Sequence, residues 1–213
     1  MFARPLVLLA RTLAASSLML GSTAAPANAW QPPEPVSAEH TFLAAPRLVE
    51  TSSGVAFAAW NRQRGLGDGA RTGVDVTVRR GGSWAPPRLV GSGSDARLLA
   101  LADLDAYGGS RAMALVQRSA GDERLLAYLL ARSGRVERIE RLDSARGIST
   151  PQAALNPDGA GVAAWIRRPQ RGSARIHAAF RRAGRAWSAP LSLSEGGAGA
   201  AGVGVRGSVA VVA

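Results

Sequence analysis

One short phrase occurs twice in this chain, about a hundred residues apart, and it constrains the fold more than any other feature. Residues 51–63 read TSSGVAFAAWNRQ, and residues 156–168 read NPDGAGVAAWIRR. Each copy passes from a turn through a glycine and alternating small apolar residues to a tryptophan and an arginine. Self-similarity at a fixed spacing marks repeat architectures, in which each unit packs on its neighbours. The chain is therefore expected to be an array of repeated units.

The similarity extends beyond the first tryptophan of each copy. Trp60 is followed by GVDVTVRRGGSWAPPRLV and Trp165 by ARIHAAFRRAGRAWSAPLSL, so that Trp84 corresponds to Trp187. A weaker copy, GSRAMALVQR, lies halfway between them with Val116 at the tryptophan position. The period is therefore about 52 residues. The expected units are about 41–95, 96–147 and 148–199, with a partial unit at 200–213.

The composition of each unit predicts β-structure. Apolar residues alternate in VAFAAW and VDVTVRR, which is the period of a half-buried strand. Glycines supply the hairpin turns. The prolines are expected at strand beginnings or in connections, where a missing N–H is tolerated; they are Pro46, Pro87, Pro151 and Pro190. The prediction is an all-β fold, a β-propeller-like array of about 3.5 four-stranded antiparallel blades that is open or a fragment of a longer ring.

The repeat resembles that of secreted bacterial β-propeller-like proteins, in which a strand ending in tryptophan precedes a glycine turn, a second tryptophan and a proline. The resemblance covers about residues 41–213 and is strongest over 156–193. The segment NPDGAGVAAW is also distantly similar to the Asp-box turns of sialidases, sharing Asp158, Gly159 and Trp165. Its spacing from glycine to tryptophan is longer than that box allows.

Two interpretations of the tryptophans differ in their consequences. A large aromatic at one place in successive units is expected to pack between sheets, whereas a ring of exposed tryptophans would bind sugars by stacking. We favour packing, and we favour a turn-capping role for Asp158. The structural repeat positions are Trp60, Trp84, Trp165, Trp187, Gly54 and Gly161.

The first 29 residues are typical of a signal peptide. Arg4 and Arg11 precede an apolar run, and the stretch APANA offers a cleavage site after Ala29. The mature chain would then begin at Trp30 with a proline-rich extended leader over 30–40, and no membrane span would remain. The expected location is extracellular or periplasmic.

The absence of cysteine excludes disulfides, thiolate metal sites and cysteine nucleophiles. The chain has no cysteine, and all 26 basic residues are arginine, which gives a net charge of +11. The arginines occur singly or in pairs without interleaved aromatics, so nucleic-acid binding is not expected. The two histidines, His40 and His177, are far apart in sequence.

No constellation of catalytic residues is found. The segment DLDAYGG places Asp103 and Asp105 before glycines and could begin a calcium loop, but Ala114 stands where a bidentate glutamate is needed. A loop connecting two blades is the favoured interpretation. A sialidase would need a tyrosine–glutamate pair, and the only tyrosines are Tyr107 and Tyr128. We assign no catalytic residue, no cofactor and no metal ligand.

The expected function is therefore that of an exported, non-enzymatic β-repeat module that binds a protein or an acidic polysaccharide. The alternative is a fragment of a secreted, sialidase-like carbohydrate-active enzyme. The last segment, SVAVVA, would leave an apolar edge strand through which the chain could associate with itself. We expect residues 200–206 and 208–213 to form a hairpin that stacks on the third unit.

Overall fold

The computed structural model describes residues 34–37, 42–64, 71–90, 99–119, 123–195, 197, 203–206 and 209–212, and these contain strands, turns and connections but no helix. The chain divides into two units, Met1–Glu34 and Pro35–Ala213, and the described strands all belong to the second. The predicted signal peptide lies outside the described residues, as does most of the predicted leader. In the part that is described, no helix is long and apolar enough to cross a membrane.

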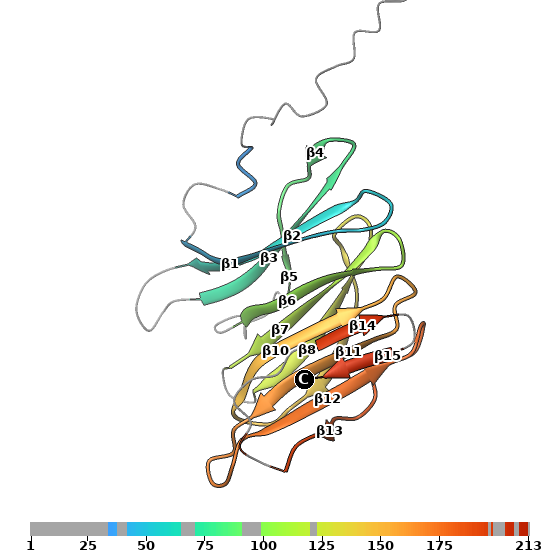
Figure 1. Cartoon of the computed structure of the whole chain (residues 1–213). Coiled ribbons are helices and arrows are strands. Elements are labelled where there is room, and N and C mark those ends of the chain that lie inside the picture. Colours follow the sequence, from blue (N-terminus) through green and yellow to red (C-terminus); the bar gives the residue numbers. More distant parts are fainter. Residues whose placement is uncertain are drawn as a thin grey trace, which may run out of the picture. The chain divides into compact units, whose positions relative to one another are not determined.

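In the described part of the chain, fifteen strands form three larger antiparallel sheets and one hairpin (Figure 1). Sheet A contains β1 (Phe42–Glu50), β2 (Ala56–Arg64), β3 (Arg71–Arg80), β4 (Ser83–Trp84) and β5 (Arg88–Val90). Sheet B contains β6 (Leu99–Tyr107), β7 (Arg111–Arg118), β8 (Arg124–Leu130) and β9 (Val136–Asp143). Sheet C contains β10 (Ile148–Leu155), β11 (Gly161–Arg167), β12 (Arg175–Arg181) and β13 (Leu191–Ser192). Hairpin D contains β14 (Val203–Arg206) and β15 (Val209–Val212).

Each larger sheet is a meander in which consecutive strands pair. In sheet A, β4 and β5 both pair with β3 and together occupy the place of a fourth strand. The all-β class and the four-stranded antiparallel sheets predicted from the alternation are confirmed. Among the described strands, no sheet closes on itself.

Sheets A and C pair their strands in the same register at the tryptophans. The four pairs are Trp60–Asp75 and Trp84–Arg79 in sheet A, and Trp165–His177 and Trp187–Arg181 in sheet C. In sheet B, Val116 pairs with Leu126 at the corresponding place. The fold is therefore repeat-like in its backbone pairing as well as in its sequence.

The first strand of each sheet carries a bulge at this position, opposite Trp60 and Trp165 in sheets A and C and beside the Leu101–Val116 pair in sheet B. The register shifts between Ala44 and Arg47, between Leu101 and Asp103, and between Ser149 and Gln152. Two of these bulges contain a proline, Pro46 in β1 and Pro151 in β10. The prediction that these two prolines lie at strand beginnings or in connections is wrong. They lie within strands, because a bulge leaves a position at which no N–H is needed for the ladder.

Two apolar layers hold the three sheets together. The layer between sheets A and B is built by Val55, Phe57, Ala59, Val74, Val76, Val78 and Val90 from sheet A and by Leu101, Leu104, Ala112, Ala114, Val116, Tyr128 and Leu130 from sheet B. The layer between sheets B and C includes Met113, Leu115, Leu125 and Leu142 from sheet B and Ala153, Leu155, Ala163, Trp165 and Ala179 from sheet C. Sheet B thus buries both faces.

Hairpin D lies against the third sheet. β14 pairs with β15, and β14 contacts β10 and β11 (Figure 1). The expected hairpin and its stacking on the third unit are confirmed. Val162 and Ala164 of β11 are fully buried on the side of sheet C that does not face sheet B.

The sequence repeat names Gly54 and Gly161 as its glycine positions, but these two glycines have different places in the structure. Gly54 donates its N–H to Thr51 at 2.9 Å with a φ of 73°, and Gly159 donates to Asn156 at 2.9 Å with a φ of 88°. The counterpart of Gly54 is therefore Gly159. Gly161 instead begins β11, where a Cβ would lie 2.5 Å from the carbonyl oxygen of Ala154. Its glycine is required by close backbone approach and not by a turn.

Candidate functional site

The first tryptophan of each copy of the repeat, Trp60 in sheet A and Trp165 in sheet C, is buried. Trp165 is 0% exposed and belongs to the apolar layer between sheets B and C. Trp60 is 4% exposed and lies on the face of sheet A that turns away from sheet B. Trp84 and Trp187 are half-buried. Rings buried in two different sheets have the geometry of packing residues and not of a shared sugar-stacking surface.

Asp103 and Asp105 lie within β6, so the blade-connecting loop predicted for this segment is wrong. The carboxylate of Asp103 accepts the N–H of Ala153 at 2.9 Å, and that of Asp105 accepts the N–H of Leu155 at 2.6 Å. Both donors belong to β10, the edge strand of the next sheet. The i, i+2 spacing thus matches two outward N–H groups of a neighbouring strand. The described residues contain no cluster of three potential metal ligands.

Several other carboxylates also bind backbone N–H groups. Glu123 accepts from Ile148 at 3.2 Å, and Glu140 accepts from Trp187 at 3.1 Å. Asp158 accepts the N–H of Ala160 at 2.8 Å, which confirms its predicted role in capping a turn. These groups connect and terminate strands.

A different set of residues forms the most distinctive pocket of sheet C. The pocket has a volume of about 640 Å³ and lies at the end of the sheet, between the β9–β10 and β11–β12 connections. It is lined by Ala145, Arg146, Arg167, Pro169, Gln170, Arg171, Gly172, Ser173, Arg175 and His177. Its size falls within the usual range for small-ligand sites, about 300–1,000 Å³.

A backbone contact fixes the two connections against each other. The N–H of Arg168 donates to the carbonyl of Gly147 at 2.8 Å. Gly147 has a φ of 72°, and a Cβ at this position would lie 1.9 Å from the carbonyl oxygen of Arg168. Only glycine permits this approach, so Gly147 sets the shape of the pocket rim.

Two residues that line the pocket, Arg167 and His177, contact polar and aromatic side chains outside its lining. Asp143, at the end of β9, accepts hydrogen bonds of 2.6 Å from Trp165 Nε1 and 2.6 Å from Arg167 Nε. Its other oxygen accepts from Arg167 Nη2. The ring of His177 stacks on Trp165 with 6.5 Å between centroids. Arg167 and His177 are therefore held in place from below.

Two pKa shifts follow from this arrangement. Burial by itself would raise the pKa of Asp143, but the hydrogen bonds and charge of Arg167, together with the Trp165 and Ser144 N–H groups, hold that pKa below its ordinary value. Burial, and then the charge of Arg167, lowers the pKa of His177. His177 is therefore neutral at neutral pH, and its Nδ1 is buried without a hydrogen-bond partner.

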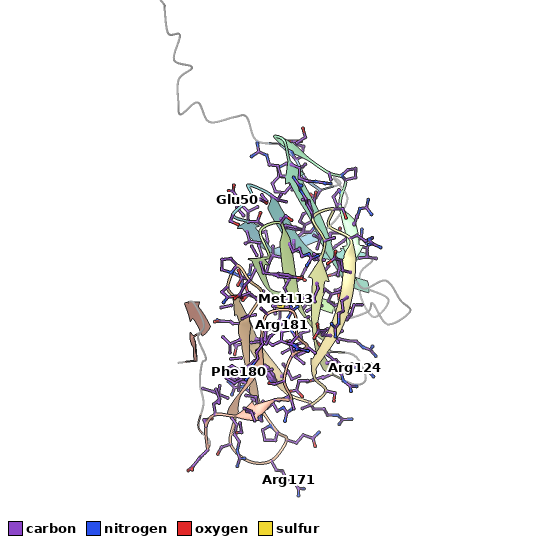
Figure 2. All side chains as sticks on the ribbon, turned by 90° about the vertical axis from the view of Figure 1, so that its right-hand side faces the viewer. Glu50, Met113, Arg124, Arg171, Phe180 and Arg181 are labelled. Carbon is purple, nitrogen blue, oxygen red and sulfur yellow. The ribbon has the colours of Figure 1, made fainter. Side chains whose placement is uncertain are left out.

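The positive charge of the pocket is only partly neutralised. Asp143 pairs with Arg167, whereas Arg146, Arg171 and Arg175 are exposed and form no ion pair with a described carboxylate. Figure 2 shows Arg171 projecting from the β11–β12 connection, away from the sheets. Guanidinium groups bind carboxylate, sulfate or phosphate oxygens in paired hydrogen bonds. The arrangement is suited to an anionic ligand.

Sequence reasoning did not find this site. The sequence predicts arginines scattered over the surface, since they occur singly or in pairs. The only local signal for a cluster is the run IRRPQRGSAR between Ile166 and Arg175. Arg146 comes from a separate connection, and only the pairing of β10 with β11 brings it near.

Comparison with known proteins assigns the chain to no group: no known protein family matches the sequence, and no curated protein matches it.

Proposed function

We propose that this is an exported, non-enzymatic β-repeat protein that binds an acidic polysaccharide through the arginine-lined pocket of sheet C. The observation that carries the proposal is the lining itself: four arginines and a histidine surround about 640 Å³ with no carboxylate among the lining residues. A concave site of this size accommodates one or two sugar rings, and their acidic groups would pair with the guanidinium groups.

The proposed architecture is a β-propeller-like array in which sheets A, B and C are successive blades. Three features support it: the common register at the tryptophan position, the bulge in each first strand, and the two apolar layers that join consecutive sheets. Stacking of four-stranded sheets through their faces is how such blades bury apolar surface.

Non-enzymatic binding is supported by the use made of the acidic residues. A glycosidase needs two carboxylates that converge on one bond. In this chain Asp103, Asp105 and Glu140 bind backbone N–H groups, and Asp143 binds Arg167 and Trp165. These four carboxylates therefore join strands and sheets.

Binding of polysaccharides with and without acidic groups tests the proposal. Isothermal titration with a polyuronate and a sulfated glycan should give saturable binding, and a neutral glucan should give none. Replacing Arg146, Arg171 and Arg175 together by Gln should weaken binding at least about tenfold, because up to three charge-assisted contacts are lost.

A matched variant separates the pocket from net charge. Arg80, Arg132 and Arg182 are also exposed and lie on other turns and strand ends. Their combined replacement by Gln removes the same charge and should leave affinity within about threefold. Equal losses in the two triple variants would mean that binding is a property of overall charge and would refute the site. Release of sugar from a sialoside or polyuronate would refute the non-enzymatic role.

A further inference from the structure

A second pocket lies where the first strands of the three larger sheets come together. It has a volume of about 520 Å³ and is lined by residues of β1, β6, β7 and β10. The strand β6 contacts both β1 and β10 (Figure 1). None of the lining residues belongs to the arginine-lined pocket of sheet C. A ligand in this second pocket would therefore be a different one from the polysaccharide proposed above.

Three side chains in the second pocket occupy one and the same position of the repeat. Arg47, Asp103 and Gln152 are each the first residue to pair after the bulge of their strand. Each partner in the second strand immediately precedes the tryptophan position of its sheet. One repeat position thus brings a guanidinium, a carboxylate and an amide to a single pocket, which we call the bulge pocket.

The two opposite charges of the bulge pocket do not neutralise each other. In the described part of the chain, no ion pair joins Arg47 and Asp103. Arg47 is exposed, and its Nη2 donates only a long hydrogen bond of 3.5 Å to the carbonyl of Ala102. A guanidinium carries several N–H donors, so most of those of Arg47 are available to a ligand carboxylate.

The carboxylate of Asp103 also keeps some of its binding capacity. One oxygen accepts the N–H of Leu104 and the other accepts the N–H of Ala153, each at 2.9 Å. An ionised carboxylate oxygen can accept more than one hydrogen bond. Asp103 is half-buried, so its position is fixed by the two strands while its oxygens can still accept from a ligand ammonium.

Neutral polar groups complete the lining. Gln117 Nε2 donates to the carbonyl of Ile148 at 2.7 Å, which orients the amide of Gln117. Thr150 and Gln152 are exposed. Thr150 has a φ of 46° and is the only residue other than glycine with a positive φ among the described residues. A β-branched residue rarely adopts this conformation, and such backbone strain is concentrated at ligand sites.

We propose that the bulge pocket binds a small zwitterion, namely a free amino acid or a short peptide with a neutral polar side chain. The ligand carboxylate pairs with Arg47, because a guanidinium matches a carboxylate in two parallel hydrogen bonds. The ligand ammonium binds Asp103, and the amides of Gln117 and Gln152 bind the ligand side chain. The volume is within the usual range for small-ligand sites, about 300–1,000 Å³. A polyanion is disfavoured here, because Asp103 would repel it.

Titration with two zwitterions tests the proposal and separates its two kinds of ligand. Isothermal titration of the protein with L-glutamine and with L-alanyl-L-glutamine should give saturable binding for at least one, with a Kd below about 1 mM. The N-acetylated form of the better ligand lacks the ammonium, and its C-terminal amide lacks the carboxylate. Each derivative should bind at least about tenfold more weakly than the zwitterion itself.

Two variants assign the two charges of the ligand to their partners. Arg47→Gln should weaken binding of the zwitterion at least about tenfold and should abolish the difference between the zwitterion and its C-terminal amide. Asp103→Asn should likewise abolish the difference between the zwitterion and its N-acetylated form. A general loss of stability would not remove one difference and keep the other. Circular dichroism shows whether each variant folds, and the exposed Arg47 carries the test if Asp103→Asn does not.

Arg80→Gln is the matched control. Arg80 is exposed at the end of β3 and does not line the bulge pocket. Its replacement removes the same charge as Arg47→Gln, and the affinity for the zwitterion should stay within about twofold.

Three results would overturn the proposal. The first is that neither zwitterion binds at up to about 10 mM. The second is that Arg47→Gln still prefers the zwitterion to its C-terminal amide by the original factor. The third is that Arg47→Gln and Arg80→Gln weaken binding equally, since the ligand would then respond to overall charge and not to the bulge pocket.

Discussion

The indole N–H of Trp165 donates a 2.6 Å hydrogen bond to Oδ2 of Asp143, and this bond joins two sheets. Trp165 lies in β11 of sheet C, and Asp143 ends β9 of sheet B. The same oxygen accepts a hydrogen bond from Arg167. One carboxylate thus closes the apolar layer between the sheets and positions an arginine of the candidate binding pocket.

Trp165→Phe should destabilise the protein more than Trp60→Phe does. Both changes replace a buried indole by a smaller phenyl ring. Only the first removes a hydrogen bond, so that Asp143 has one donor fewer. We expect the difference in unfolding free energy to be about 1–2 kcal/mol. Denaturant unfolding measures it. Equal costs would show that the bond to Asp143 contributes nothing net.

The corresponding alanine variants test packing alone. Trp60→Ala and Trp165→Ala should each cost about 3–5 kcal/mol, the range for deletion of a buried large aromatic. Unchanged melting temperatures combined with loss of glycan binding would instead favour the sugar-stacking interpretation.

Asp143→Asn should flatten the dependence of stability on acid pH. The folded-state pKa of Asp143 is held below its ordinary value, so the unfolded state takes up the proton first as pH falls. The stability that its charge contributes is therefore fully present above the unfolded pKa of about 3.9 and is lost as pH falls through the folded pKa.

The variant should also be less stable at neutral pH, by about 2–4 kcal/mol, because the partly buried Arg167 loses its ionised partner. Melting temperatures between about pH 2 and 7 for both proteins provide the test. If the melting temperatures of both proteins fall in parallel as pH decreases, Asp143 does not cause the loss of stability in acid.

The strands could be predicted from the sequence because their signals are local. The alternation in VAFAAW and VDVTVRR and the glycine turns specify a meander, and the recurrence of Trp60 at Trp165 shows that the meander is repeated. The bulges could not be predicted, because Pro46 and Pro151 read equally well as strand boundaries. Their position depends on pairing with the second strand.

The pocket and the links between sheets depend on contacts across sheets. Asp103 and Asp105 carry the pattern of a loop or a calcium ligand, and only the position of β10 shows that they bind strand N–H groups. Likewise, Arg146 and Arg175 are separated by two strands in sequence and meet at one pocket. A single sequence contains no direct signal for such juxtapositions.

Asp103→Ala and Asp105→Ala should each destabilise the protein by about 1–3 kcal/mol, because a strand N–H at the sheet B–sheet C boundary loses its acceptor. Calcium should leave the melting temperature of the natural sequence unchanged, since these carboxylates already accept N–H groups of β6 and β10. Differential scanning fluorimetry with calcium or a chelator decides the question. A rise in melting temperature that depends on calcium and disappears in both variants would establish a metal site.

Exported protein should begin at Trp30. Ala27 and Ala29 match a small-residue cleavage pattern, and Arg4 and Arg11 would give the positive end of the predicted signal peptide. N-terminal sequencing of the product recovered outside the cytoplasm checks this directly. A mature product that retains Arg11 would contradict the assignment.

Gly147→Ala should damage both the fold and the pocket, whereas Gly184→Ala should be mild. The two glycines have similar φ values, 72° and 68°, so a side chain strains the backbone equally at both, by about 1–2 kcal/mol. At Gly184 nothing lies within 4 Å of a new Cβ, but at Gly147 the Cβ would lie 1.9 Å from the Arg168 carbonyl oxygen. The β9–β10 and β11–β12 connections must then separate, at a further cost of about 1–3 kcal/mol.

Because Arg146 and Arg171 lie on these two connections, glycan affinity should fall together with stability. Unfolding and titration of both variants measure the two effects, and equal behaviour of the pair would show that the contact between Gly147 and Arg168 does not shape the site.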